Sequence, residues 1–191
     1  AEVLCGPIPP MVEFSDMYTP LEELPDSTRE LFEYHPEKAR QLLAEAGYPD
    51  GFKTEIACLT SDVDMLSIVK AYWADIGVDL DLQVKEYAVW VSLLQSKTFT
   101  DMISFGVTFT LPFKFVFTRP GNMYNPAMVD DPKLNEIIAK VDSSYFDEAN
   151  RRQLMTEAAP YMIEQAYWVQ LPGPYLYTFW WPWVKGYNGE A

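Results

Sequence analysis

The sequence contains very few of the side chains that most often hold metal ions or act as nucleophiles. It has two cysteines and one histidine, too few for a zinc site with four thiolates or for a disulfide-rich scaffold. With His35 as its only imidazole, a Ser-His-Asp triad has little support, and the sequence has no phosphate-binding loop or nucleophile elbow. In an oxidising compartment Cys5 and Cys58 could form a single disulfide, but the sequence does not establish that they meet. We therefore expect no metal site, no cofactor and no catalytic residue in this chain.

Basic residues are also scarce, since 14 lysines and arginines stand against 28 aspartates and glutamates and give a net charge of −14. A surface this acidic repels phosphate backbones and anionic lipid headgroups, so we expect no nucleic-acid partner and no peripheral membrane binding. One run without charge, 165–184, is long enough to span a membrane, but Pro172, Pro174 and Pro182 would interrupt a spanning helix. We expect this run to be irregular or extended.

What the sequence has in quantity is aromatic and apolar side chains. Apolar residues make up 49% and charged residues 22% of the 191 residues, a balance typical of a compact globular domain rather than of a disordered chain. The aromatic residues are 6 tryptophans, 12 tyrosines and 11 phenylalanines. So many rings either fill a core or line a binding cleft, and composition alone does not distinguish the two.

Hydrophobic periodicity predicts alternating helices and strands between residues 35 and 106. Val78, Leu80 and Leu82 alternate with charged or polar neighbours, which is the period-two pattern of a strand. Pro36 suits the first position of a helix, and Gly47 supplies its left-handed end. Because strand, helix and strand follow one another over 53–84, we expect two parallel strands joined by a right-handed crossover. The predicted order is a helix at 36–46, a strand at 53–59, a helix at 62–76, a strand at 78–84, a helix at 87–96 and a strand at 101–106.

The rest of the chain is predicted to be less regular, apart from two helices. Proline and glycine interrupt residues 1–34 and 107–130, and both segments favour loops. Asp131 begins one helix that runs to about 141, and Asp147 caps a second that continues toward 164, within which Pro160 predicts a kink or an early end. The tail 166–184 favours strands and turns. For the helix at 62–76 we expect an inward face composed of Met65, Ile68, Val69, Tyr72 and Ile76.

The segment 34–52 has the sequence Tyr-His-Pro-Glu-Lys-Ala-Arg-Gln-Leu-Leu-Ala-Glu-Ala-Gly-Tyr-Pro-Asp-Gly-Phe. It closely resembles the signature of the family 5 extracellular solute-binding proteins, which are the peptide, dipeptide and nickel receptors of ABC importers. Later segments resemble the same family. Residues 76–80 are similar to the end of one of its βαβ elements. Residues 130–138 and 150–154 are similar to two of its helices, and residues 125–126 are similar to the segment that precedes these helices. The resemblance covers nearly the whole chain, although full-length members are much longer and have two lobes joined by a hinge.

The resemblance implies an α/β fold, namely a periplasmic-binding-protein-like lobe with a mixed sheet, βαβ units and flanking helices. It implies that residues 1–191 are a single domain, the C-terminal lobe of a two-lobed protein. Within this lobe we expect a loop-rich leading segment at 1–34, the α/β body at 35–184 and an exit toward the hinge at 185–191.

The function that the resemblance implies is that of the substrate-binding component of an ABC importer, which captures a small solute, peptide-like or other, outside the cytoplasmic membrane. The implied partners are this ligand, shared with a missing N-terminal lobe, and the ABC permease subunits. We expect the full-length protein to be monomeric and periplasmic or extracellular, with lipid anchoring to the cell surface as one option.

In peptide-binding members of the family, an aromatic residue at a strand end packs on the ligand and a nearby aspartate pairs with its amino group. The matching stretch here, 104–112, keeps an aromatic residue but contains no carboxylate. A buried ammonium without such a partner loses a charge-assisted hydrogen bond of roughly 1.5–3 kcal/mol, so an uncharged, partly apolar or polyhydroxylated ligand is favoured. The alternative is a strand end packed on its own helices. The candidate ligand-binding residues in this stretch are Phe105, Gly106, Thr108, Phe109 and Thr110.

Three further candidate ligand-binding residues lie outside that stretch. Trp90 belongs to a helix that is apolar nearly all round, so core packing is favoured over ligand stacking. Asn122 and Tyr124 lie in a long loop where the family places cleft contacts, although each alone also fits an ordinary turn. Trp180, Trp181 and Trp183 either cover the surface that meets the missing lobe or fill a sheet edge or the core. Two other functions stay open, a stand-alone interaction module with an exposed aromatic surface and, with less support, a hydrolase domain.

Overall fold

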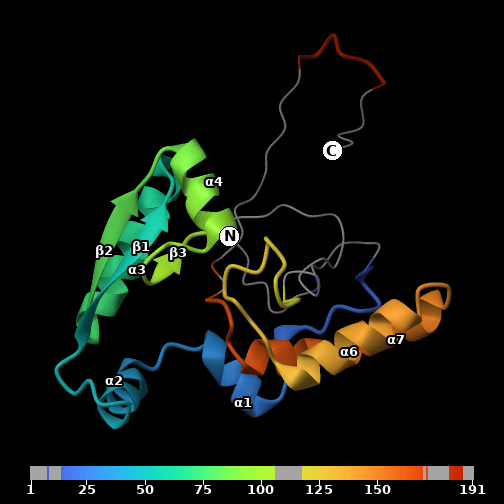
Figure 1. Ribbon diagram of the computed structural model, residues 1–191, viewed down its shortest axis with the longest axis horizontal. Helices are drawn as coiled ribbons and strands as arrows, with labels where there is room; N and C mark the ends of the chain where they lie inside the picture. The colour runs from blue at the N-terminus through green and yellow to red at the C-terminus, as the bar shows by residue number, and fades with distance from the viewer. Residues whose placement is uncertain (1–7, 9–13, 106–117, 170, 172–180, 187–191) are drawn as a thin grey trace.

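The computed structural model describes residues 8, 14–105, 118–169, 171 and 181–186 of the chain (Figure 1). Short helical turns come first, followed by an α/β segment and then by a pair of long helices. None of the helices in this described part is both long and apolar enough to cross a bilayer. The elements are η2 (Leu21–Glu23), α1 (Asp26–Arg29), η3 (Glu30–Phe32), α2 (Pro36–Glu45), β1 (Phe52–Cys58), η4 (Thr60–Asp62), α3 (Val63–Asp75), β2 (Val78–Val84), α4 (Tyr87–Ser96), β3 (Met102–Ile103), α6 (Pro132–Ser143) and α7 (Glu148–Glu164).

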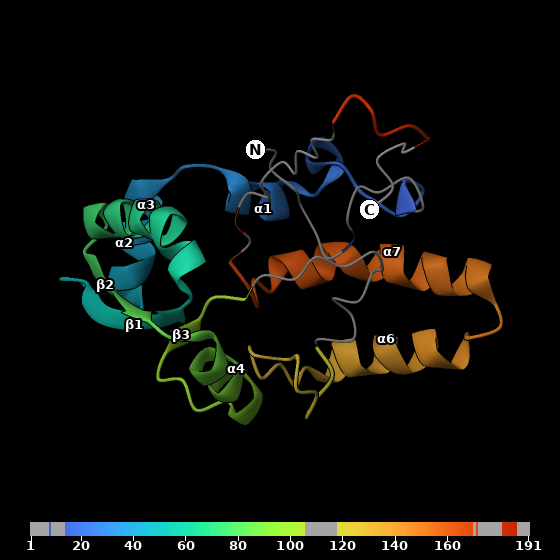
Figure 2. The same ribbon diagram turned by 90° about the horizontal axis from the view of Figure 1, so that it is seen from above.

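The sheet confirms the predicted α/β fold and its parallel βαβ unit. Its strand order is β2-β1-β3, and β1 pairs in parallel with both neighbours, in the registers Phe52↔Val78 and Ile56↔Met102. A chain that moves from β1 to β2 and then across to β3 needs helices on opposite faces of the sheet if both crossovers are right-handed. Figure 2 shows α3 and α4 on opposite faces. All strand pairs in the described ranges are parallel, so these ranges do not include the antiparallel strand of a mixed sheet.

Helix α3 forms where the sequence predicts it, but the predicted inward face was wrong in part. Leu66 is buried and Val69 and Trp73 are half-buried, whereas Met65, Ile68 and Tyr72 are exposed. Both sets follow the spacing i, i+3, i+7, because α3 carries two apolar stripes. Periodicity therefore identifies the helix but does not choose between its faces. Packing against β2 makes the choice.

Helix α7 reaches Glu164 as predicted, and it continues past Pro160, so the early end that was one of two expected effects of this proline does not occur. A proline inside a helix has no N–H to donate to the carbonyl four residues earlier, which here belongs to Thr156. The residues around the proline (Ala158, Ala159 and Met162) are buried. Their packing stabilises the helix through the position where its backbone is weakest.

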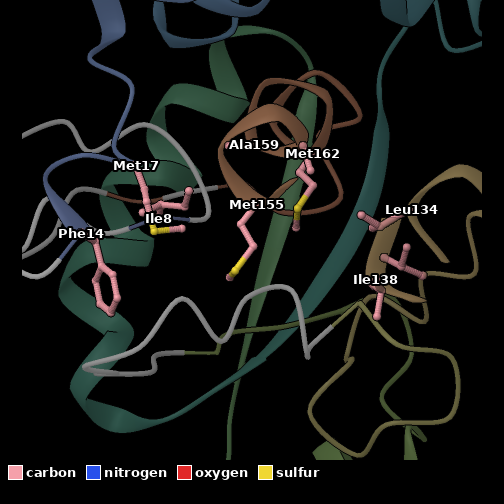
Figure 3. Close-up of a cluster of buried hydrophobic side chains, with 10 residues drawn as sticks. Ile8, Phe14, Met17, Leu134, Ile138, Met155, Ala159 and Met162 are labelled. Carbon is pink, nitrogen blue, oxygen red and sulfur yellow. The ribbon is translucent and has the colours of Figure 1, made fainter. Parts of the chain in front are cut away.

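Buried apolar side chains form two groups, one on each part of the structure. The sheet unit, residues 52–105, buries Ala57, Cys58, Leu66, Val78, Leu80, Trp90 and Leu94. The helical unit consists of α6, α7 and the N-terminal residues that pack on them. In its core, side chains from α6 and α7 meet others from the N-terminal part of the chain (Figure 3). Each large side chain buried in this way contributes about 1.5–3 kcal/mol of hydrophobic free energy. The core of the helical unit contains Ile8, Phe14, Met17, Val129, Leu134, Ile138, Met155, Ala158, Ala159 and Met162.

The segment that resembles the family signature connects α2 to the turn between α3 and β2. Arg40 on α2 donates from Nε and Nη2 to the carbonyl oxygen of Asp75, at 3.1 and 2.8 Å. Gly51, at the end of the signature, lies against Gly77, where a Cβ would come within 1.8 Å of the Gly77 carbonyl oxygen. A small open cavity of about 190 Å³ lies between these parts. The segment therefore has a packing role, which accounts for Gly51, whereas Gly47 is suited to its position by its positive φ.

Candidate functional site

The carboxyl ends of β1 and β3 are joined by a hydrogen bond between side chains. Ser104, directly after β3, donates from its hydroxyl to Oδ2 of Asp62 at 2.6 Å. The same oxygen accepts the N–H of Leu59 at 3.3 Å, and Oδ1 accepts the Ser61 hydroxyl at 3.1 Å. Ligands of open parallel sheets bind outside the carboxyl ends of the strands. This edge of the sheet is therefore the candidate site.

Three aromatic side chains lie in a row beside this edge. The rings of Tyr87 and Trp90 stack with centroids 6.2 Å apart and an interplanar angle of 22°. The rings of Trp90 and Phe105 stack at 6.3 Å and 18°. Trp90 donates from Nε1 to the carbonyl oxygen of Ser104 at 3.1 Å, which fixes the row against the strand end. We call Tyr87, Trp90 and Phe105 the aromatic row.

Exposure differs along the aromatic row. Trp90 is 7% exposed, in agreement with the core packing that the sequence favours, whereas Tyr87 is 68% exposed. Phe105 lies between these extremes. Stacked rings are worth about 0.5–1.5 kcal/mol beyond their buried area, so the row is a firm surface. Tyr87 is the member of the row that is most accessible to a ligand.

The thiol of Cys58 lies at the end of β1 but is not suited to chemistry. Cys58 is a free cysteine and fully buried. Burial raises the pKa of this thiol, and the carboxylate of Asp62 raises it further. A protonated, buried thiol is a poor nucleophile and a poor metal ligand. Cys5, the other cysteine of the disulfide that the sequence allows, lies outside the described residues.

The structure brings together two of the predicted ligand-binding residues, Trp90 and Phe105. Four others, Gly106, Thr108, Phe109 and Thr110, lie outside the described residues. The aromatic residue at the predicted strand end therefore stands beside the helix residue that was predicted separately, and both border the same carboxyl edge. Their contact with a ligand stays a prediction.

Asn122 and Tyr124 belong to a turn before α6 rather than to the strand ends. Asn122 accepts the N–H of Tyr124 through Oδ1 at 2.8 Å, and its own N–H donates to the carbonyl oxygen of Arg119 at 3.1 Å. In Figures 1 and 2, the segment 118–131 lies between α4 and α6. The Asn122 side chain thus shapes the turn, while Tyr124 is exposed.

Sequence reasoning did not assign a role to Asn125 or a place in the site to Asp62. Asn125 is buried and bonds through its side chain to three backbone groups: its Nδ2 donates to the carbonyls of Arg119 and Val129, and its Oδ1 accepts the N–H of Val129, all within 3.1 Å. It therefore holds the loop that contains Asn122. Asp62 was only the first residue of the helix predicted at 62–76, although its position soon after a predicted strand was a signal that it lies near the strand end.

A second polar cluster connects the two long helices. Asp131, before α6, accepts the hydroxyls of Tyr161 and Tyr167 through Oδ2, each at 2.6 Å, and the N–H of Leu134 through Oδ1 at 2.9 Å. The Tyr161 hydroxyl, followed by that of Tyr167, lowers the pKa of Asp131 to about 2. The two tyrosine hydroxyls connect α7 and the segment after it to the start of α6, and the Leu134 bond caps α6, so this cluster is structural.

The described residues include no group of three or more histidine, cysteine, aspartate or glutamate side chains placed to share a metal ion. The candidate site consists instead of stacked rings, a hydroxyl and a carboxylate whose two oxygens already accept hydrogen bonds. This arrangement can pack against apolar or planar groups and bond to polar ones.

Comparison with known proteins identifies the family. The family model described as bacterial extracellular solute-binding proteins, family 5 Middle, matches residues 1–124. Heme-binding protein A of Haemophilus influenzae is 29% identical over 174 residues, which cover 82% of this chain and 30% of that protein. The glutathione-binding protein GsiB of Salmonella typhimurium is 41% identical over 51 residues, 27% of this chain and 8% of that protein.

Solved structures resemble the fold as well. HbpA2 from Haemophilus parasuis has a TM-score of 0.71 and 27% identity, and the match covers 87% of this chain and 33% of that one. The periplasmic binding protein DppA from Helicobacter pylori, in complex with the peptide STSA, has a TM-score of 0.61 and 22% identity, over 71% of this chain and 28% of that one. The chain thus spans about a third of the length of these relatives. It belongs to the bacterial extracellular solute-binding proteins of family 5.

Proposed function

We propose that this chain is one lobe of the substrate-binding component of an ABC importer and contributes half of a site for a small solute. The observation that carries the proposal is the family match over residues 1–124, a range that includes the carboxyl edge of the sheet and the aromatic row. The chain spans about a third of the length of its relatives, which supports a half-site that a second lobe completes.

The mechanism that fits this arrangement is closure of two lobes around the solute. A ligand that contacts both lobes has a higher affinity for the closed state and shifts the equilibrium toward it by that difference in affinity. In this chain the aromatic row would supply one wall, and the Asp62–Ser104 bond would keep the loops after β1 and β3 in place. Alone, this lobe would bind weakly because half of the contacts and the enclosure are missing.

The proposed ligand is a peptide-like solute that places an apolar group on the aromatic row. Both oxygens of Asp62 already accept hydrogen bonds, so Asp62 is a poor primary partner for a free peptide amino group. The peptide carried by DppA and the name of the glutathione-binding relative support this class. A tetrapyrrole is the second candidate, which the accessible ring of Tyr87 and the name of heme-binding protein A favour.

The same proposal gives the location and the partners. DppA is a periplasmic binding protein, which supports a periplasmic or extracellular location, and we add lipid anchoring to the cell surface as part of the proposal. The ABC permease subunits would receive the solute. The proposed role is binding without catalysis, as in the rest of this family of binding proteins.

Thermal unfolding of the full-length protein tests the proposal. We would add reduced glutathione, a set of dipeptides and hemin in separate samples, since a ligand at 100 times its dissociation constant stabilises by about 2.7 kcal/mol. One of these classes should raise the melting temperature of the two-lobed protein clearly and that of residues 1–191 much less. Tyr87→Ala should weaken the response, whereas Tyr72→Ala, on an exposed face of α3, should not. A response to none of the solutes, or turnover of one of them by this chain, would contradict the proposal.

A further inference from the structure

Trp90 contacts both other members of the aromatic row but has little surface of its own to offer a solute. Its side chain is 7% exposed, and its ring stacks on the rings of Tyr87 and Phe105 with centroids 6.2 and 6.3 Å away. Tyr87 is largely exposed and Phe105 is half-buried. Any part that Trp90 plays in recognition therefore acts mainly through these two neighbours.

The indole N–H of Trp90 restrains the peptide unit that leads into Phe105. It donates to the carbonyl oxygen of Ser104 at 3.1 Å. Because a peptide unit is planar, the direction of the Ser104 carbonyl determines where the nitrogen and Cα of Phe105 lie. Trp90 thus restrains Phe105 in two ways, through the backbone before it and through the stacking of the two rings.

The other hydrogen-bonding groups of Ser104 are bonded as well. Its N–H donates to the carbonyl oxygen of Ala57 on β1 at 2.8 Å, and its hydroxyl donates to Asp62 of η4 at 2.6 Å. Together with the bond from Trp90 on α4, these contacts bring three elements to one residue at the end of β3. A substitution that removes the indole N–H leaves the other two bonds in place and releases the carbonyl that orients Phe105.

Helix α4 places Tyr87 and Trp90 on the same face. The two residues are three positions apart, so their side chains are neighbours on the helix surface, and Leu94, four positions further along, is buried. The pose of Trp90 therefore affects Tyr87 on one side and Phe105 on the other. Side chains that are held in place before a ligand arrives lose less conformational entropy when it binds.

We propose that Trp90 is the positioning residue of the candidate site, which sets the poses of Phe105 and Tyr87 for the solute. This assignment rests on the solute-binding function proposed above. It predicts that solute affinity depends on the indole N–H of Trp90, although that group is bonded to the backbone and not to the solute. Core packing alone predicts instead that the N–H affects stability and leaves the affinity of the folded protein unchanged.

The test removes the N–H of Trp90 and keeps the shape of its ring. In the full-length protein, Trp90 is replaced by benzothienylalanine, in which a sulfur atom takes the place of the indole N–H. Calorimetric titration with reduced glutathione, the dipeptide Met-Leu and hemin, at a temperature at which both proteins are folded, should show binding about threefold weaker or more for the solute that binds. The same replacement at Trp73, half-buried on α3, is the matched control and should leave the affinity unchanged.

A second measurement follows Phe105 directly. A fluorine label on the ring of Phe105 gives a fluorine NMR signal that reports the surroundings of this ring without added solute. The signal should shift or broaden when Trp90 is replaced by benzothienylalanine and should stay the same when Trp73 is replaced. A loss of stability alone would not produce this change in the folded protein.

The remaining outcomes separate this role from the proposed function. An unchanged affinity with the analogue at Trp90, together with weaker binding by Tyr87→Ala, would overturn the positioning role and leave the solute site standing. Weaker binding with an unchanged fluorine signal would also overturn it, because Trp90 would then act by direct contact with the solute. Failure of the parent protein to bind any of the three solutes would contradict the proposed function and this role together.

Discussion

Gly51 approaches the backbone of Gly77 so closely that a side chain does not fit. The Cβ of an alanine at this position would lie 1.8 Å from the Gly77 carbonyl oxygen, and φ at Gly51 is +76°. Gly47 has a φ of +95°, but among the described residues no atom lies within 4 Å of its Cβ position. Substitution of Gly51 by alanine therefore brings both backbone strain and a steric clash, whereas substitution of Gly47 brings backbone strain alone.

We predict that Gly51→Ala lowers the free energy of unfolding by about 3 kcal/mol or more, since it combines the clash with the strain. Gly47→Ala, the control, should cost about 1 kcal/mol through its backbone alone. Urea unfolding followed by circular dichroism measures both values. Similar costs for the two variants would mean that the signature segment does not pack against the α3–β2 turn in solution.

Asp131 makes stability depend on pH in the acid range. Its pKa in the folded protein is about 2, below the ordinary value of 3.8, because of the Tyr161 hydroxyl first and the Tyr167 hydroxyl second. A group whose pKa is lowered by folding stabilises the folded state above its unfolded pKa, and this contribution is lost as the pH falls through the folded pKa. The stabilisation by Asp131 should therefore be complete above about pH 4 and decline toward pH 2.

We predict that the double variant Tyr161→Phe/Tyr167→Phe is less stable than the parent protein at pH 6 and that the difference narrows at pH 3. The variant keeps the N-cap bond from Asp131 to Leu134 and removes only the two hydroxyls. Urea unfolding at both pH values gives the comparison. A difference of the same size at pH 6 and pH 3 would show that the hydroxyls do not act through the ionised carboxylate.

At the scale of elements, one side-chain bond fixes the loops that follow β1 and β3. Asp62 accepts the Ser104 hydroxyl, the Leu59 N–H and the Ser61 hydroxyl. We predict that Asp62→Ala destabilises the chain by about 1–3 kcal/mol, because it leaves these donors without their acceptor. Asp64→Ala, at an exposed position in the first turn of α3, should change stability by less than about 0.5 kcal/mol. If both variants behave alike in urea unfolding, the bond does not organise the strand ends.

The elements differ in how well the sequence predicts them. Strand β2 and helix α4 begin and end where the pattern places them, because β2 alternates strictly and α4 is a compact apolar run with a left-handed residue, Lys97, at its end. Helix α3 has two apolar stripes, and only its contact with β2 decides which one is inside. The continuation of α7 past Pro160 likewise depends on core contacts that no local pattern contains.

The candidate site was predictable only in part, for a related reason. Phe105 and Trp90 were identified on separate grounds, and their stacking follows from the path of α4 across the sheet to β3. Asp62 and Ser104 are 42 residues apart in the sequence, and nothing local links them. Their contact requires the position of β3 beside β1, whereas periodicity predicted the parallel pairing of β1 and β2 alone.

At the scale of the whole molecule, the two groups of buried side chains raise the question of how tightly the sheet unit and the helical unit are coupled. Leu134 is fully buried in the core of the helical unit, and Leu80 is buried in the sheet unit. Removing a buried leucine side chain costs about 2–5 kcal/mol. In a protein with two cores, this loss of free energy lowers the stability of the unit that contains the cavity before it affects the other unit.

We predict that Leu134→Ala lowers amide hydrogen-exchange protection in α6 and α7 while β1 and β2 retain most of theirs, and that Leu80→Ala has the opposite effect. The reciprocal pair is its own control, since both variants remove the same atoms from buried sites. Loss of protection throughout the described elements in both variants would mean that the chain unfolds as a single cooperative unit. Independent units would allow the sheet unit to adjust to solute while the helical unit keeps its own packing, because strain in one core would not be passed on to the other.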